Sequence, residues 1–232
     1  MLKNTIQGIL ILIGILLSFH IEDSRIEQKN FEIKNELLSD LNRAISDDLE
    51  QIKNLKEILN SSLDSISELQ DDMNKNHQLL SDEEVIKKLI DLNVSISFFP
   101  QDGVFTELIS SGSFELIKSK ELKSKLLEIY NHQKERNLSI SDDIDIVMKD
   151  YELEIMTNFR IGIDYNSSDG EFYGKPILSD YEFNRDYYLS NELYGLMSLN
   201  YLFGVMYSRL LNDIEKSHEA TLALSMLEID KS

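Results

Sequence analysis

Histidines and carboxylates are the residues of this chain that could do chemistry, and their spacing predicts no catalytic or metal site. Histidines stand at only four places, His20, His77, His132 and His218, and none forms a His-x-x-x-His or His-Glu-x-x-His pattern. The sequence also has no Gly-x-Ser-x-Gly turn, phosphate-binding loop or dinucleotide fingerprint. With 42 acidic residues, neighbouring carboxylates are expected by chance. We therefore expect a protein that is not an enzyme and that needs no metal or cofactor.

Two acidic stretches could attract a divalent cation, but neither pattern is typical of a site. The stretch from Asp142 to Asp145 stands where a helix is expected to begin, and carboxylates there usually complement the helix dipole while remaining in water. The stretch from Asp164 to Lys175 begins like a calcium loop, but its sixth position is Asp169 instead of glycine and its twelfth is lysine instead of glutamate. Solvated carboxylates are the favoured interpretation of both.

Composition limits the partners and the class of protein. The 232 residues carry a net charge of −19, so a basic surface that clamps nucleic acid is not expected. The absence of cysteine excludes disulfides and thiolate chemistry. Hydrophobic residues make up 42% of the chain, with only 2 prolines and 9 glycines. This composition indicates an ordered, all-α protein instead of a disordered or loop-rich one.

The longest apolar stretch runs from Thr5 to Ile21 and predicts a transmembrane anchor at residues 1–21. The central anchor residues are Ile9, Leu10, Ile11, Leu12, Ile13, Gly14, Ile15, Leu16 and Leu17. A helix of about 17 residues is roughly 25 Å long, near the lower limit for crossing the hydrocarbon core. A cleaved signal peptide is the main alternative, although Phe19 to Asp23 lacks the small residues of a cleavage site. A buried helix of a soluble fold is a further alternative.

The charges beside the apolar stretch predict its orientation in the membrane. Lys3 precedes the stretch and Glu22 and Asp23 follow it, although Arg25 and Lys29 on the far side weaken the bias, so we expect a single-pass protein with a cytoplasmic N-terminus and an exported C-terminal domain. Membrane lipid is then the first partner. Gly14 and Ser18, four residues apart, could let two anchors associate.

Residues 22–232 are predicted to form one extracytoplasmic helical bundle domain that begins with a long helix. Apolar residues recur every seven positions, at Phe31, Leu38, Ile45, Ile52, Leu59, Ile66 and Met73. The complementary positions include Lys34, Asp48 and Ser62, which interrupt the coiled-coil seam. Further leucines widen the apolar stripe toward the face of a bundle helix. No proline or glycine lies between Ile15 and Pro100, so the anchor is expected to run straight into this helix.

Shorter elements follow. Ser81 and Glu84 have the spacing of a capping box that opens a short helix, and an extended connector follows it up to Gly103. We expect a helix from Phe114 to Tyr130 that resumes or persists through Ile144 to Phe159, with a polar joint near Asn137 to Asp143. A last helix is expected from about 184 to 227. One aromatic-rich irregular insertion is expected at about 160–180, where Tyr173 and Tyr181 could form a partner surface.

A break at Ser110, Ser111, Gly112 and Ser113 separates two helices near the middle of the chain. Gly112 could let two helices meet closely or could end the first helix with a left-handed residue. A structural corner is the favoured interpretation. The alternative is a partner or ligand site built on the hydroxyls of Ser110, Ser111 and Ser113.

Three segments resemble a known family. They are the apolar segment from Gly8 to Phe19 with its charged exit, the helix from Leu37 to Leu49, and the stretch from Phe99 to Tyr130 that is pinched at Ser110 to Gly112. In these segments the chain resembles uncharacterised single-pass membrane proteins of Gram-negative bacteria, which are known only as a domain of unknown function. The resemblance implies an anchor in the bacterial inner membrane with a helical periplasmic C-terminal domain, and it implies no activity.

The favoured function is a non-enzymatic interaction or scaffold subunit of a membrane complex, in which a protein partner or a second copy binds the helical domain. The alternative is an extracytoplasmic sensor that binds a small ligand between helices and signals through a membrane partner. An enzyme whose site is assembled from distant residues is the third possibility.

Overall fold

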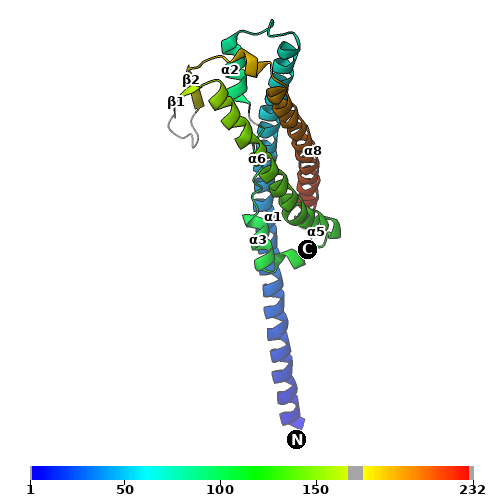
Figure 1. The fold of residues 1–232 in the computed structure, drawn as a ribbon. Helices are drawn as coiled ribbons and strands as arrows, with labels where there is room; N and C mark the ends of the chain where they lie inside the picture. The colour runs from blue at the N-terminus through cyan, green and yellow to red at the C-terminus, as the bar shows by residue number, and fades with distance from the viewer. Residues whose placement is uncertain (1, 93, 167–174, 230–232) are drawn as a thin grey trace. The chain divides into compact units, whose positions relative to one another are not determined.

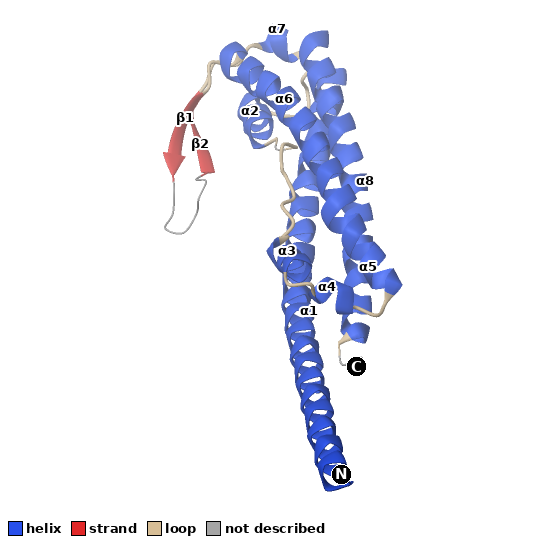
Figure 2. Ribbon diagram, turned by 90° about the horizontal axis from the view of Figure 1, so that it is seen from below, coloured by secondary structure: helices blue, strands red, loops and turns tan. Residues whose placement is uncertain are grey.

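The computed structural model shows a chain that is helical almost throughout, as the composition predicts (Figures 1 and 2). The structure describes residues 2–92, 94–166 and 175–229, and it describes side chains in these ranges except at 2–10, 165–166 and 175–176. The helices are α1 (Leu2–Asn74), α2 (Asp82–Asp91), α3 (Gly103–Ser110), α4 (Ser113–Leu116), α5 (Lys120–Leu127), the π-helix η1 (Glu128–Gln133), α6 (Lys134–Asn158), α7 (Arg185–Tyr188) and α8 (Asn191–Glu228).

The expected irregular insertion contains a β-hairpin. Strand β1 (Gly162–Asn166) pairs antiparallel with β2 (Lys175–Asp180), with Ile163 opposite Leu178. Residues 167–174, which include Tyr173, lie outside the described residues. The short extended piece expected at the start of the insertion is strand β1.

The chain divides into two compact units. Unit 1 comprises residues 1–48, 100–131 and 217–232, and unit 2 comprises residues 49–99 and 132–216. The long helices α1 and α8 contribute residues to both units.

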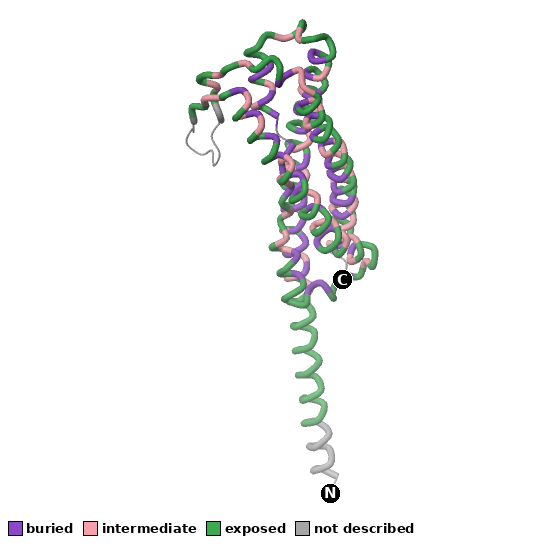
Figure 3. Tube along the Cα trace, in the orientation of Figure 1, coloured by how far each residue is buried: buried purple, intermediate pink, exposed green. Residues whose placement is uncertain are grey.

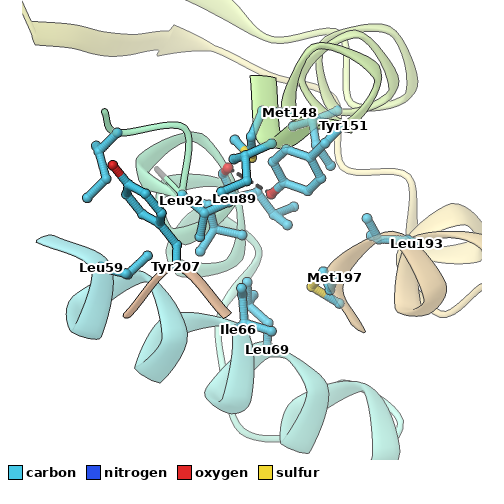
Figure 4. Close-up of a cluster of buried hydrophobic side chains, with 14 of the residues drawn as sticks. Leu59, Ile66, Leu69, Leu89, Leu92, Met148, Tyr151, Leu193, Met197 and Tyr207 are labelled. Carbon is cyan, nitrogen blue, oxygen red and sulfur yellow. Dashed lines mark hydrogen bonds between the residues drawn. The ribbon is translucent and has the colours of Figure 1, made fainter. Parts of the chain in front are cut away.

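The core of unit 2 is built on the seven-residue repeat of α1. Figure 4 shows buried side chains that converge from several elements: Leu59, Ile66 and Leu69 from α1, Leu89 and Leu92 from α2 and the residue after it, Met148 and Tyr151 from α6, and Leu193, Met197 and Tyr207 from α8. A repeat of seven keeps these α1 residues on one face, and that face is fully buried at Ile52, Leu59 and Ile66. Burying each such side chain stabilises the fold by roughly 1.5–3 kcal/mol.

The connector after α2 is held in unit 2 by a network of three buried groups. The amide of Phe98 donates to the Tyr207 hydroxyl at 2.8 Å, and this hydroxyl donates to Asn137 Oδ1 at 3.0 Å. Asn137 Nδ2 in turn donates to the Phe98 carbonyl at 2.7 Å. The extended backbone of the connector makes no helical hydrogen bonds. The side chains of Tyr207 and Asn137 therefore supply hydrogen-bond partners for the amide and the carbonyl of Phe98.

The core of unit 1 combines aromatic contacts with buried charges. The ring of Phe105 stacks on Tyr130 with centroids 4.7 Å apart and meets Phe114 edge-on at 6.1 Å. On α1, Lys34 and Asp48 are each only 1% exposed. These two residues therefore do not break the buried face of α1 as the interrupted seam suggested.

Partners on the last helix explain how unit 1 buries those charges. Lys34 Nζ lies 3.5 Å from the Glu228 carbonyl, and Asp48 Oδ2 lies 3.5 Å from His218 Nε2. The Glu228 carboxylate accepts hydrogen bonds from the amides of Lys118 at 2.5 Å and Ser119 at 3.2 Å, just before α5. Buried charges need such partners because an unpaired one costs several kcal/mol.

The helix beyond Tyr130 was expected either to resume or to persist, and it persists, because η1 leads directly into α6 and the polar side chains Asn137 and Ser141 face the interior. One expected boundary was wrong. The last helix is divided, because α7 ends at Tyr188 and α8 begins at Asn191. The capping box is confirmed: Ser81 N donates to Glu84 Oε2 at 2.8 Å and Glu84 N donates to Ser81 Oγ at 3.3 Å.

Candidate functional site

The apolar part of α1 is exposed on every side. Every residue from 11 to 30 is exposed (Figure 3). The exposed fractions are 64% for Ile11, 59% for Leu16 and 65% for Phe19. A helix face that packs on its own protein alternates buried and exposed residues, and this segment shows no such alternation. Residues 11–21 of this segment therefore present a largely apolar surface, and charged residues begin at Glu22.

Among the described residues, none of the helices combines the length and the apolar character needed to cross a membrane. Residues 5–10 of the predicted anchor, including Ile9 and Leu10, lie outside the residues whose side chains are described.

The predicted pair for anchor association lies in the exposed segment. Ser18 Oγ donates to the Gly14 carbonyl at 2.9 Å, so the hydroxyl is satisfied within its own helix. A Cβ atom built on Gly14 would meet no atom within 4 Å. The surface around Gly14 is thus open, and association there stays a prediction.

The serine corner has the geometry of a helix end. Gly112 has a φ of +78°, the left-handed conformation that favours glycine, and a Cβ built there meets no atom within 4 Å. The left-handed backbone conformation therefore explains why residue 112 is a glycine, and no close approach of another helix is needed. Ser110 Oγ donates to Glu107 O at 3.2 Å, and Ser111 Oγ donates to Ser113 Oγ at 2.9 Å. Ser113 is 3% exposed, so the expectation that it offers a surface hydroxyl was wrong.

The aromatic residues after the hairpin pack inward. The Phe183 ring stacks on His77 with centroids 4.9 Å apart and lies 5.7 Å from the ring of Phe159. Tyr188 is fully buried, and Tyr181 is half-buried against the same core. The predicted partner surface at Tyr181 is therefore only partly available, and the stretch mainly covers unit 2.

A buried histidine sits between two carboxylates where α1 ends and α2 begins. His77 Nδ1 lies 2.7 Å from Asp72 Oδ2, and His77 Nε2 lies 2.8 Å from Asp82 Oδ1. The hydroxyl of Tyr188 donates to the same Asp72 oxygen at 2.7 Å. Both ring nitrogens are occupied and the imidazole side chain is 4% exposed, so neither nitrogen can reach a substrate. These hydrogen bonds therefore stabilise the turn between α1 and α2 and do not form a reactive site. The sequence did not predict them, because Tyr188 lies more than a hundred residues further along the chain.

Electrostatics favour the charged forms in this corner. Burial alone would raise the pKa of Asp72, but hydrogen bonds from His77, Tyr188 and the amides of Leu79 and Leu80 outweigh it and lower this pKa. Burial alone would lower the pKa of His77, but hydrogen bonds to Asp82 and Asp72 and their charges raise it. In the part of the chain that the structure describes, no group of three or more histidine or acidic side chains is placed to hold a metal ion.

A groove in unit 2 lies between α6 and α8 and joins apolar and acidic side chains. Its volume is about 390 Å³, and it is lined by Asp150, Leu153 and Glu154 from α6 and by Glu192, Gly195, Leu196 and Leu199 from α8. Gly195 leaves the α8 side open, because a Cβ there would meet no atom within 4 Å. Such a groove can hold an apolar side chain while the acids attract positive charge.

Sequence reasoning missed this groove although the sequence carried a signal. Ile146 and Leu153 lie seven residues apart on α6, and Leu199 and Met206 lie seven apart on α8. Each pair shares a helix face, and all four side chains are between 39% and 62% exposed. These exposed apolar pairs form a second apolar stripe on each helix, beside the buried one, and such a stripe indicates a surface that can bind another helix.

Other cavities lined by described residues of unit 2 include one apolar and one polar cavity. One has a volume of about 230 Å³ and is mainly apolar, lined by Leu89, Ile90, Leu92, Tyr151, Glu152, Ile155, Met156 and Ile163. The other has about 530 Å³ and is mainly polar, lined by Thr157, Asn158, Arg160, Glu182, Phe183, Asn184, Arg185 and Asp186. In the polar cavity, Arg160 pairs with Glu182 at 3.3 Å, and Arg185 donates to the Asn76 carbonyl at 2.7 Å.

Comparison with known proteins gives one family. A family of unknown function (DUF6090) matches residues 7–153, which include the exposed apolar segment, the serine corner and most of α6. No curated protein and no solved structure matches the chain.

Proposed function

The chain belongs to the family of unknown function DUF6090, and we propose that it is a membrane-anchored helical protein that acts as a non-enzymatic interaction or scaffold subunit of a membrane complex. In this proposal the N-terminal part of α1 lies in lipid and the two helical units bind a protein partner or a second copy. The partner is not nucleic acid, because the net charge of −19 would repel it.

The observation that carries the proposal is the exposed apolar surface of α1. Eight large apolar side chains are 47–65% exposed there, namely Ile11, Leu12, Ile13, Ile15, Leu16, Leu17, Phe19 and Ile21. Removing a fully exposed side chain of this kind from water is worth roughly 1.5–3 kcal/mol, and these eight are about half exposed, so a lipid environment would stabilise the segment by on the order of 10 kcal/mol. With the apolar residues that precede them, they make up a stretch of about 17 residues, which is near the minimum for a span.

Flanking charges support a bacterial inner-membrane location with the bulk of the chain in the periplasm. Lys3 precedes the apolar stretch, and Glu22 and Asp23 follow it. The likeness to single-pass proteins of Gram-negative bacteria supports the same topology.

Fractionation and thiol labelling test this location, because the chain has no native cysteine. Asp47, an exposed residue of α1, is replaced by cysteine, and intact cells of a Gram-negative host are treated with a maleimide that does not cross the inner membrane. We expect carbonate-resistant membrane association and labelling in intact cells. Labelling only after cell lysis would place the domain in the cytoplasm, and release by carbonate would refute the anchor.

A charged variant tests whether the apolar segment is the cause. Leu12→Arg with Leu16→Arg should release the protein from the membrane, since each arginine costs about 2.5–3.5 kcal/mol at the centre of a span. Asn54→Arg with Asn60→Arg adds two arginines at exposed positions of α1 outside the stretch and its flanking charges, and serves as the control that stays bound. Equal membrane association of both variants would contradict the proposal.

A small-ligand sensor is the second candidate, and the apolar cavity of about 230 Å³ favours it. A compound that co-purifies with the protein and is lost from an Ile155→Trp variant, which fills this cavity, would support the sensor. Native mass spectrometry of the protein in lipid discs measures this directly.

A further inference from the structure

We propose that the groove between α6 and α8 binds a basic amphipathic helix of a partner protein. This inference rests on the proposed interaction role and names the chemistry of the partner. The apolar side chains that line the groove are Leu153, Leu196 and Leu199, and its acids are Asp150, Glu154 and Glu192.

Apolar side chains extend the groove into a track. Leu202 and Met206 follow Leu199 at spacings of three and seven residues and are 53% and 46% exposed. Ile146, seven residues before Leu153, is 62% exposed. An α-helix with apolar residues at i, i+3, i+4 and i+7 places its side chains along such a track.

Helices α6 and α8 run antiparallel, so the exposed apolar residues of both helices extend from the groove in the same direction. Asn137, near the start of α6, bonds to Tyr207 on α8 at 3.0 Å. Near the other end of α6, Leu153 shares the groove with Glu192 at the start of α8. Ile146 and Met206 therefore both continue from the groove in one direction, and an occupying helix can contact both stripes.

Charge selects the occupant. The three acids of the groove contrast with the nearest basic residues on these helices, Lys149 and Arg209, which are not among the lining residues. A second copy of the chain would bring the same acids and a net charge of −19, so it would be repelled. A helix with lysine or arginine beside its apolar stripe complements both the acidic and the apolar side chains of the groove.

Glu154 has a structural role that separates it from the other two acids. Its Oε2 accepts hydrogen bonds from Asn158 Nδ2 at 2.8 Å and from the Tyr187 hydroxyl at 3.4 Å. Burial, and then the charge of Glu154, raises the pKa of Tyr187 to about 12, so this hydroxyl stays a donor. Asp150 and Glu192 are therefore the acids to change in a binding test.

The test uses the full chain in discs of zwitterionic lipid and a fluorescent peptide of about 18 residues, roughly five helical turns, with leucine on one face and lysine on the other. Empty discs give the lipid background. The groove variant is Asp150→Lys with Glu192→Lys. The control variant is Glu57→Lys with Asp213→Lys, which has the same net charge and changes exposed acids of unit 2 outside the groove. Circular dichroism confirms that both variants fold.

We expect the groove variant to bind the lysine peptide about tenfold more weakly than the control variant. We also expect Leu153→Ser with Leu199→Ser to weaken binding, and a matched peptide with glutamate in place of lysine not to bind the unmodified chain. Equal weakening in the groove and control variants would show attraction to net charge alone and would overturn the proposal.

A thiol at Leu202 distinguishes the occupants. In a Leu202→Cys chain, a disulfide to a cysteine in the apolar face of the peptide supports the proposal. A disulfide between two chains, formed equally with or without peptide, would place a second copy in the groove and overturn it. Membrane attachment is measured separately, so a chain that remains in the membrane but binds no peptide refutes only this inference.

Discussion

Replacing Asp72 by alanine should destabilise unit 2 more than any change of a neighbouring surface acid. Asp72 is fully buried, and its Oδ1 accepts hydrogen bonds from the amides of Leu79 at 2.7 Å and Leu80 at 3.1 Å. Its Oδ2 accepts from Tyr188 and contacts His77, each at 2.7 Å. The substitution leaves two amides without this acceptor and removes one of the two carboxylates from a buried histidine.

The expected cost follows from those contacts. Removing one partner of a buried, hydrogen-bonded charge pair costs about 3–5 kcal/mol. Asp71 provides the matched control, because it is the adjacent aspartate, its side chain is 54% exposed and it pairs only with Lys75 one turn later among the described residues. Asp71→Ala should cost less than about 0.5 kcal/mol. Asp72→Asn keeps an acceptor but loses the charge, and we expect an intermediate cost.

Two measurements check this prediction. Urea unfolding followed by circular dichroism gives the free energy of unfolding of the three variants, and hydrogen exchange reports the protection of the Leu79 and Leu80 amides. We expect both amides to lose protection in Asp72→Ala and to keep it in Asp71→Ala. Unfolding free energies within about 1 kcal/mol of each other for the two alanine variants would refute the charge-pair argument.

Three further outcomes are expected. Because the pKa of His77 is raised from 6.5, its contribution to stability is full below that pH and is lost as the pH rises through the raised pKa. His77→Gln should therefore flatten the pH dependence of urea unfolding above pH 6.5, and an unchanged slope would contradict this. Tyr207→Phe removes the hydroxyl that the Phe98 amide and Asn137 share, and it should lower the free energy of unfolding by about 2 kcal/mol in the same assay. Equal stability of the variant and the unmodified chain would show that the network is not needed. Gly204→Leu should destabilise the protein by at least about 2 kcal/mol, because even a Cβ atom at this position would lie 2.8 Å from Leu63 Cδ2. Gly195→Ala should stabilise α8 by about 1 kcal/mol, because a Cβ atom there meets no atom within 4 Å. A similar effect of the two substitutions on the melting temperature would contradict this reasoning.

Local features could be predicted because their causes are local. The capping box at Ser81 and Glu84 needs only residues three apart. The left-handed conformation of Gly112 follows from a glycine between two short helices. The candidate groove was not predicted, because Leu153 and Leu199 line one cavity only after α6 and α8 pack antiparallel.

The seven-residue repeat by itself determined the long helix and its buried face, because residues seven apart on a helix lie on one side whatever packs against them. Only tertiary structure decided the role of the polar residues in that face. Lys34 and Asp48 are buried because Glu228 and His218, 194 and 170 residues away in the sequence, arrive on α8 to contact them. The same applies to Asp72, whose carboxylate is tolerated in the core because His77 and Tyr188 complete its hydrogen bonds. Periodicity is a property of one helix, whereas the pairing of a buried charge requires a second segment whose position no local pattern records.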